Sequence, residues 1–359
     1  MSESSFDYTN SGVVKCESCG ADMTYEPSLG KLSCAYCNST RDVEKRVPHI
    51  RDFLQERVHG YVENDDSVYK CPNCGGQVAL GGFKTATNCP FCGATNIVKV
   101  QDIKGLKPDS ILPFKLPKQK ACAYGKRWLK YKPFVPTQYK KHMDEESFKG
   151  VYIPSFAFNA DSYSTYEGRL GERRTRTVGT GKNRHTETYI YWYRVSGSDS
   201  RTFVNTMIEA SPQIQQKELD KLLPFDVDFT EAYTKEYLAG FSAERYNASL
   251  DESFDIAKHK MDDVIRSAII ARYHADVVDY LNVNTRYDKI KFRYTLLPLW
   301  ICARTFRKKL YRVIVNGRTG KSTGNLPVSG VKVGALVLAC IAVLTTIALL
   351  VCHYMLGII

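Results

Sequence analysis

Residues 16–37 read CESCGADMTYEPSLGKLSCAYC, and residues 71–92 read CPNCGGQVALGGFKTATNCPFC. Both stretches have the pattern C-x2-C-x14-C-x2-C. Two cysteines three positions apart can be held by one tight turn, so each C-x2-C pair supplies half of a tetrahedral thiolate site. The repeat predicts two β-rich zinc ribbons with two sets of ligands: Cys16, Cys19, Cys34 and Cys37, then Cys71, Cys74, Cys89 and Cys92.

A shell of four thiolates leaves no coordination position for water or substrate. The expected cofactor is therefore a pair of structural Zn²⁺ ions, and no catalytic residue is assigned. Disulfides or a redox dithiol are the alternatives. Disulfides require an oxidising compartment, and the polar first fifteen residues show no signal-peptide pattern. We expect the cysteine-rich part of the chain to lie in the cytosol.

The other end of the chain is apolar. Val333 to Cys352 is a run of 20 residues without a charged side chain, long enough to cross the roughly 30 Å hydrocarbon core of a bilayer as a helix. The net charge of +12 gathers before it, because residues 289–359 contain eleven Lys or Arg and no Asp or Glu. By the positive-inside rule, we expect a single-pass protein of the cell (inner) membrane with cytosolic N-terminal domains.

Basic residues before the apolar run are candidates for contact with anionic lipid, which each attracts by about 1 kcal/mol near the surface. They are Arg304, Arg307, Lys308, Lys309 and Arg312. The alternative is a solvated strand pair whose charges mainly fix the membrane topology. The sequence favours neither.

Composition and periodicity divide the chain into five segments. They are a first zinc ribbon (1–40), a linking helix (within 41–67), a second zinc ribbon (68–100), an α+β domain with antiparallel sheet (101–330) and a transmembrane anchor (331–359). Apolar residues at helical spacing place the linking helix over Pro48–His59, where it would pack the two ribbons together.

Within the α+β domain, β-branched and aromatic residues predict five strands. These are Val151–Tyr166, Thr188–Val195, Asp276–Val283, Lys289–Leu297 and Leu310–Val315. Ser249 and Glu252 form a capping box that opens a helix. Its buried stripe is predicted as Phe254, Ala257, Met261, Ile265, Ala268 and Arg272.

Asn316-Gly317 predicts a type I′ hairpin turn. The surrounding segment resembles a phosphate-binding loop, but G-x-x-x-x-G-K-[ST] requires glycine at position 315, which is Val315. The spacing therefore gives no support for nucleotide binding.

A basic segment over 169–185 precedes the aromatic residues Tyr189, Tyr191, Trp192 and Tyr193. Together they could form a nucleic-acid surface. The alternative is an exposed hairpin loop on a tyrosine-rich sheet, which we prefer because tyrosine is common on half-buried strands.

Five sequence pieces carry a resemblance to known proteins. They are ILPFK (111–115), GVYIPSFAF (150–158), YLAGFSAERY (237–246), LPLW (297–300) and VNGRTGK (315–321). The pieces lie between the predicted ribbons and the predicted anchor. In this order they resemble a bacterial family of zinc-ribbon single-pass membrane proteins. Its members are often labelled as transcription-factor-type (TFIIB-type) zinc ribbon or replication-restart helicase-like proteins.

In bacilli, a protein of the kind resembled is encoded beside a phage-shock protein A homologue and a flotillin-like protein. The resemblance implies an adaptor in envelope maintenance, with one of these as its cytosolic protein partner, and no catalytic residues. We therefore expect a non-enzymatic, membrane-anchored scaffold that acts in envelope stress. The alternative is a membrane-tethered nucleic-acid-binding protein.

Overall fold

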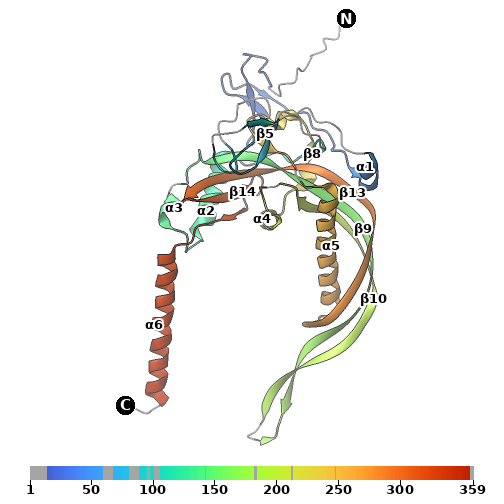
Figure 1. Ribbon diagram of the computed structural model, residues 1–359, viewed down its shortest axis with the longest axis vertical. Coiled ribbons are helices and arrows are strands. Elements are labelled where there is room, and N and C mark those ends of the chain that lie inside the picture. Colours follow the sequence, from blue (N-terminus) through green and yellow to red (C-terminus); the bar gives the residue numbers. More distant parts are fainter. Residues whose placement is uncertain are drawn as a thin grey trace.

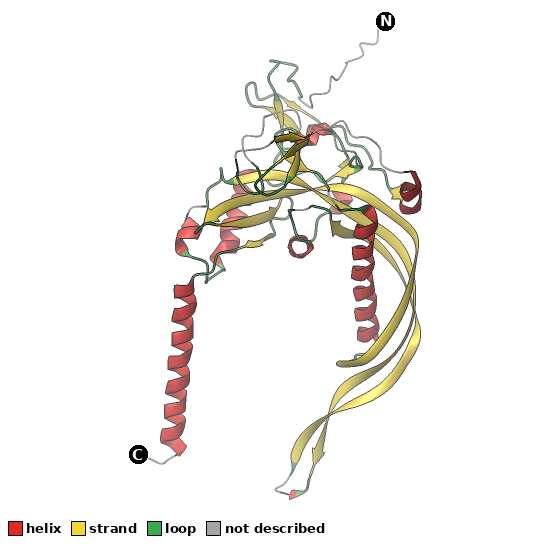
Figure 2. Cartoon of the chain, viewed as in Figure 1, coloured by secondary structure: helices red, strands yellow, loops and turns green. Residues whose placement is uncertain are grey.

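Long antiparallel strands dominate the molecule. The structure, a computed structural model, describes residues 14–59, 68–80, 89–94, 98–100, 106–141, 143–181, 184–211, 213–246 and 248–355. In Figure 1 the N-terminal part lies above a curved sheet, and helix α6 (Gly330–Met355) extends downward on the side opposite the curved strands. Figure 2 shows that strands make up most of the body, with helices at its edges and on one face of the sheet.

The first cysteine unit, defined here as residues 14–41, has a small sheet of its own. Its strands pair antiparallel in the order β1-β2-β3. They are β1 (Met23–Glu26), β2 (Lys31–Cys34) and β3 (Thr40–Arg41). The side chain of Tyr25 is buried against Tyr237 and Phe241, with ring centroids 5.3 and 6.4 Å away. The unit is thereby fixed to the body.

The linking helix is shorter than its sequence predicts. Helix α1 covers Phe53–His59, and the two residues before it form β4 (Arg51–Asp52), which pairs with the main sheet. The ring of Phe53 lies 4.7 Å from that of Phe254 and 6.3 Å from that of Phe292. The segment packs on the main domain because its largest apolar side chain finds an aromatic core there. Residues 60–67 lie outside the described part of the chain.

The second cysteine unit (residues 68–80, 89–94 and 98–100) shares a sheet with the main domain. Its strands are β5 (Val68–Lys70), β6 (Gln77–Leu80) and β7 (Val98–Val100). Strand β6 pairs antiparallel with β12 (Ser242–Glu244), and β12 pairs in parallel with β9 (Phe148–Val178). The hydrogen-bonded sheet therefore continues across the predicted domain boundary near residue 100.

The main sheet has 12 strands. The remaining ones are β8 (Ser110–Ile111), β10 (His185–Glu209), β11 (Glu231–Ala232), β13 (Val277–Phe306), β14 (Lys309–Asn316) and β15 (Ser322–Asn325). Strand β9 lies between β10 and β13 and pairs antiparallel with both. The predicted strands over Val151–Tyr166 and Thr188–Val195 are interior parts of the 31-residue β9 and the 25-residue β10.

The prediction of separate strands over Asp276–Val283 and Lys289–Leu297 is wrong, because both belong to β13. The register shifts between Asp288 and Lys291, and Lys289 has a φ of 51°. An extra residue of this kind is a β-bulge, which bends a strand without ending it. Further shifts lie between Val278 and Tyr280 of β13 and between Phe203 and Thr206 of β10. These bulges give the long strands the curvature seen in Figure 1.

Helix α5 (Leu250–Arg272) lies against the curved sheet (Figure 1). Its predicted capping box is confirmed, since the Ser249 side chain accepts a hydrogen bond from Glu252 N and the Glu252 side chain accepts one from Ser249 N. The buried stripe continues through Ile269, whereas Ala268 is only half-buried and Arg272 is exposed. At its lower end, Ile265 and Ile269 pack with residues of β9, β10 and β13.

The other helices lie at the edges of the body. They are α2 (Lys118–Lys130), α3 (Thr137–Lys141), α4 (Gln216–Leu222), the 3-10 helices η2 (Val227–Phe229) and η3 (Lys235–Leu238), and α6 (Gly330–Met355). Helix α6 contains the apolar run and has a mean hydropathy of 2.7 over Gly330–Val351, none of which is buried in the body. By length and composition it can cross a membrane.

The type I′ prediction at Asn316-Gly317 is wrong. Neither residue has a positive φ, and a wider turn through Gly320 joins β14 to β15. Asn316 is buried, and its side-chain Oδ1 accepts hydrogen bonds from the backbone N–H groups of Arg318 and Thr319. Two consecutive positive φ values, 50° and 64°, instead occur at Arg307 and Lys308 between β13 and β14.

The five pieces that carry the family resemblance meet in one aromatic cluster. Phe114 stacks on Phe241 at 4.4 Å and lies 4.9 Å from Tyr152 and 5.1 Å from Trp300. A Cβ on Gly317 would lie 2.5 Å from the Phe114 ring, so this position requires glycine. The pieces are remote in sequence but adjacent in the core. They are therefore determinants of the fold.

Candidate metal centres

The first cysteine cluster is assembled by two tight turns. Gly20 N donates to Cys16 O at 2.8 Å, and Asn38 N donates to Cys34 O at 3.0 Å. Each turn ends at a residue of positive φ, 72° at Gly20 and 58° at Asn38. Asparagine thus fills the position where glycine stands in the other turns, since it tolerates this conformation better than most residues.

The second cluster repeats this geometry with glycine in both turns. Gly75 N donates to Cys71 O and Gly93 N to Cys89 O, both at 2.8 Å, and the φ values of the two glycines are 74° and 76°. Of the four cysteines, Cys71 and Cys89 are buried and the other two are half-buried. Its ligand-bearing loops lie deeper than those of the first cluster, where Cys19 and Cys37 are exposed.

In each cluster the four sulfur atoms lie within 4.8 Å of one another. Cys16 Sγ to Cys37 Sγ and Cys19 Sγ to Cys34 Sγ are both 3.5 Å, and the corresponding distances in the second cluster are 3.6 Å. A tetrahedral metal with bonds of about 2.3 Å places its sulfurs about 3.8 Å apart, whereas a disulfide has about 2.05 Å. Both clusters can hold a metal ion through the predicted cysteines, and all eight thiols are free.

Contacts from the main domain support the second cluster. The side-chain amide of Gln213 donates to the backbone carbonyl of Cys74 at 3.0 Å. A Cβ at Gly76 would lie 3.0 Å from the ring of Phe91, which is itself fully buried. The second cluster therefore shares packing and hydrogen bonds with the α+β domain.

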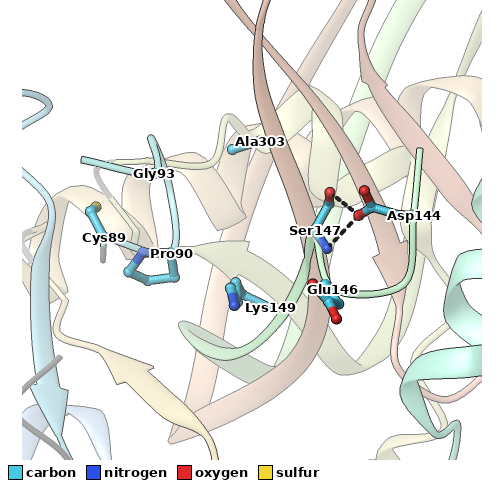
Figure 3. Close-up of a pocket in the computed structure, with 8 residues that line it drawn as sticks. All are labelled: Cys89, Pro90, Gly93, Asp144, Glu146, Ser147, Lys149 and Ala303. Atoms are coloured by element: carbon cyan, nitrogen blue, oxygen red, sulfur yellow. Dashed lines mark hydrogen bonds between the residues drawn. The ribbon is translucent and has the colours of Figure 1, made fainter. Parts of the chain in front are cut away.

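A polar pocket of about 300 Å³ adjoins the second cluster (Figure 3). It lies between Cys89–Gly93 on one side and Asp144–Lys149 on the other. Asp144 accepts hydrogen bonds from both the backbone N and the Oγ of Ser147. These bonds fix the position of its carboxylate in the pocket wall. The pocket is a shallow surface feature beside a ligand loop and presents mixed charge.

Two carboxyl groups, those of the buried Glu244 and the half-buried Glu209, had no signal in the sequence. Glu244 ends β12, and neither of its carboxylate oxygens has a hydrogen-bond partner among the described residues. Burial raises the pKa of Glu244 well above its usual value, and burial raises that of Glu209, at the end of β10, to about 8. With a pKa of about 8, the Glu209 carboxyl is largely protonated at neutral pH.

We expect Glu209→Gln to stabilise the protein more at pH 8 than at pH 6. Above its unfolded pKa of about 4.5, Glu209 keeps a proton in the folded protein that the unfolded chain has lost, so folding stability falls as the pH rises toward 8. Glutamine removes this loss. Thermal unfolding of both proteins at the two pH values measures the difference, with Asp263→Asn at an exposed site of α5 as the control. An equal shift at both pH values would contradict the expectation.

The basic segment 169–185 is mostly strand rather than loop. Arg169, Arg173, Arg174 and Arg176 lie on β9, Arg184 directly precedes β10, and positions 182 and 183 lie outside the described residues. Arg174 pairs with Glu172 at 2.8 Å and stacks 4.3 Å over Tyr191. Arg176 pairs with Glu187 at 3.1 Å and stacks over Tyr189 at 5.5 Å. The charges that a nucleic-acid surface would offer are partly compensated within the hairpin.

The candidate lipid-contacting residues lie on the β13–β14 hairpin. Arg307 and Lys308 form its turn, and Lys309 is exposed beside them. Arg304 stacks 6.0 Å from the ring centroid of Tyr139 in α3, whereas Arg312 donates to the backbone carbonyl of Gln213 at 2.8 Å. Arg312 is thus engaged with the body, and the turn is the solvated part.

The comparisons with known proteins give one clear relationship. A protein of Bacillus subtilis (strain 168), named "Uncharacterized protein YdjG", is 30% identical to this chain over 328 residues. The aligned region covers 89% of this chain and 92% of the relative. No family model matches the chain. No solved structure matches it significantly.

Proposed function

This chain belongs to the same family as the Bacillus subtilis protein YdjG, and we propose that it is a non-enzymatic, membrane-anchored adaptor that binds a cytosolic protein partner through its metal-bearing body. The observation that carries the proposal is the pairing of two four-cysteine clusters with one long apolar helix at the other end of the chain. The clusters are structural sites, since four cysteines satisfy a tetrahedral metal completely.

Zinc is the metal that we propose for both clusters. It prefers tetrahedral thiolate coordination, and structural sites made of four cysteines in short C-x2-C pairs are characteristic of zinc ribbons. The sulfur–sulfur distances of 3.5 and 3.6 Å fit this geometry. Each ion would join two turns that otherwise lie at the ends of short strands.

The helix α6 supports an anchored state in the cell membrane. Basic residues such as Arg318, Lys321 and Lys332 precede its apolar run, which favours retention of the body in the cytosol. In the adaptor model, a phage-shock protein A-like or flotillin-like protein is the partner, as the family resemblance of the sequence implies. A role in envelope stress follows from that partner.

The alternative, a membrane-tethered nucleic-acid-binding protein, has the exposed arginines of β9 in its favour. Against it stand the acidic partners of Arg174 and Arg176 and the stacking of both on tyrosines of the neighbouring strand. These tyrosine faces are covered by guanidinium groups, so fewer are open to bases. The adaptor therefore remains the better proposal.

Full-length protein purified from membranes in mild detergent is expected to retain a cytosolic protein partner of the phage-shock protein A or flotillin type. Replacing Arg173, Arg174 and Arg176 with serine should leave this partner in place and leave nucleic-acid binding at the weak level of any basic surface. Affinity purification with identification of the bound proteins, and a titration with RNA and DNA at increasing salt, measure the two quantities.

The contrary outcome is also defined. Tight, sequence-selective nucleic-acid binding that is lost in the triple variant would favour the alternative. Its affinity would fall with a log–log salt slope of about −0.7 per phosphate contact on single strands. Such binding without a retained protein partner would contradict the adaptor proposal.

A further inference from the structure

Helices α2 and α3 form a second basic surface that the sequence did not single out. Residues 111–143 contain nine Lys or Arg and no Asp or Glu. The exposed ones are Lys115, Lys120, Lys126, Arg127, Lys130 and Lys141. Within the described part of the chain, no ion pair joins any of these six to an acidic side chain. Their charge is therefore open to an anionic partner, unlike that of the paired arginines on β9.

Aromatic side chains accompany this charge. Tyr131 is 70% exposed and Phe134 is 37% exposed, both on the segment that joins α2 to α3. Lys132 Nζ lies 5.0 Å from the ring centroid of the half-buried Trp128. Aromatic rings with basic neighbours are the composition found where proteins meet the headgroup region of a bilayer.

The same segment touches the beginning of α6. The backbone N of Ser329 donates to Phe134 O, and Lys332 Nζ donates to Val135 O, each at 2.8 Å. Burial, with a smaller contribution from the charge of Lys332, lowers the pKa of Lys140. Figure 1 shows α2 and α3 beside the upper end of α6. Because the apolar span begins at Gly330, this surface lies at the point where the chain would enter the membrane.

We propose that Lys126, Arg127, Lys130, Tyr131 and Phe134 form a platform that rests on the bilayer and binds the headgroups of anionic phospholipids. The proposal depends on the membrane anchoring proposed above and adds a lipid class and a set of residues to it. The platform adjoins the β13–β14 turn, because the Tyr139 ring of α3 packs 5.7 Å from Phe306 and 6.0 Å from Tyr311. The lipid candidates of that turn extend the same surface.

Charge and position together favour lipid over an acidic protein. A platform next to the anchor stays near the bilayer whatever angle α6 adopts to the body, because only four residues separate the end of β15 at Asn325 from the start of α6 at Gly330. The local concentration of headgroups there is high, so individually weak contacts are sufficient. Tyr131 and Phe134 would then enter the interfacial region, while the lysines contact phosphate groups.

The test uses the full-length protein reconstituted into vesicles of phosphatidylcholine alone or of an equal mixture with phosphatidylglycerol. A benzoylphenylalanine photocrosslinker at position 131 or 134 is expected to label lipid, with a higher yield in the anionic vesicles. The same probe at Tyr36, which is 84% exposed in the first cysteine unit, is the control and should not label lipid. Equal yields in the two vesicle types would overturn the proposal.

A charge-matched pair of variants completes the test. K126Q/R127Q/K130Q should lower the yield in anionic vesicles at least about fivefold, the factor that one basic contact contributes. K15Q/K31Q/K45Q, which removes the same charge in and next to the first cysteine unit, should preserve it. In native membranes, crosslinks from 131 or 134 to an acidic protein in place of lipid would overturn the lipid assignment.

Resistance to alkaline extraction is measured on the same samples, so the two proposals can fail separately. If the protein stays in the membrane but shows no dependence on anionic lipid, the platform is wrong and the anchor stands. If alkali removes the unmodified protein, the anchor itself is wrong, and the platform fails with it.

Discussion

Cys89→Ser is expected to lower the zinc content of the full-length protein from about two ions per chain to about one, as measured by elemental analysis. Cys89 is buried, and its backbone carbonyl accepts the hydrogen bond that closes the turn at Gly93. Serine keeps this turn but supplies neither the thiolate nor an equivalent soft ligand. Structural zinc contributes about 10 kcal/mol or more to the folding of such units. We expect the second cysteine unit to unfold in the variant.

The loss should spread beyond the cluster. Strand β6 of this unit pairs with β12, which also pairs with β9 of the main sheet. Thermal unfolding of the α+β domain should therefore begin at a lower temperature in Cys89→Ser than in the unmodified protein. Cys340→Ser, at an exposed site in α6, is the matched control and should retain both ions. A folded, reduced protein that carries less than one zinc per chain would contradict the metal assignment.

Ile341→Arg combined with Leu344→Arg is expected to abolish stable membrane insertion. Each arginine near the centre of a membrane helix costs about 2.5 to 3.5 kcal/mol, so the pair removes most of the free energy that an apolar span of this length can provide. Both residues lie near the middle of α6. Alkaline extraction of membranes should release the variant and leave the unmodified protein behind.

Val331→Arg is the control for this experiment. It adds one arginine at the end of α6 nearest the body, where basic residues favour retention in the cytosol. Insertion should be preserved.

Protease added to intact spheroplasts should spare the body of the unmodified protein. Digestion of the cysteine units from outside would reverse the proposed orientation.

Features that depend on local sequence were predictable. The capping box at Ser249 and Glu252 and the apolar run of α6 lie where the sequence places them. The eight cysteines gather as predicted, because their spacing encodes the turns directly. Each of these signals is contained within a few consecutive residues or within a repeated spacing.

Features that depend on remote pairing were not predictable. The bulge at Lys289 resembles an interruption in sequence, yet β13 continues because β9 supplies hydrogen-bond partners on both sides of it. The link from β6 through β12 to β9 joins residues far apart in the chain. Glu244 looks like an ordinary charged residue, and only the assembled fold shows that it is buried without partners among the described residues.

The basic platform was missed for a related reason. The sequence prediction of lipid contact covered only basic residues close to the anchor along the chain, such as Arg307 and Lys308. The charges of α2 and α3 precede the apolar run by about two hundred residues and reach it only through contacts such as Phe134 with Ser329. Proximity in the fold, rather than along the chain, determines which charges meet the membrane.

The shared direction of α6 and the β9–β10 hairpin has a consequence for membrane insertion. Both extend toward the lower end of the molecule in Figure 1. With α6 across a bilayer at this angle, the lower part of the β9–β10 hairpin would also lie at the depth of the membrane, where charged side chains and open strand edges are not tolerated. The angle between α6 and the body must therefore differ in the inserted protein, and a change between Asn325 and Gly330 would break the hydrogen bond from Ser329 N to Phe134 O.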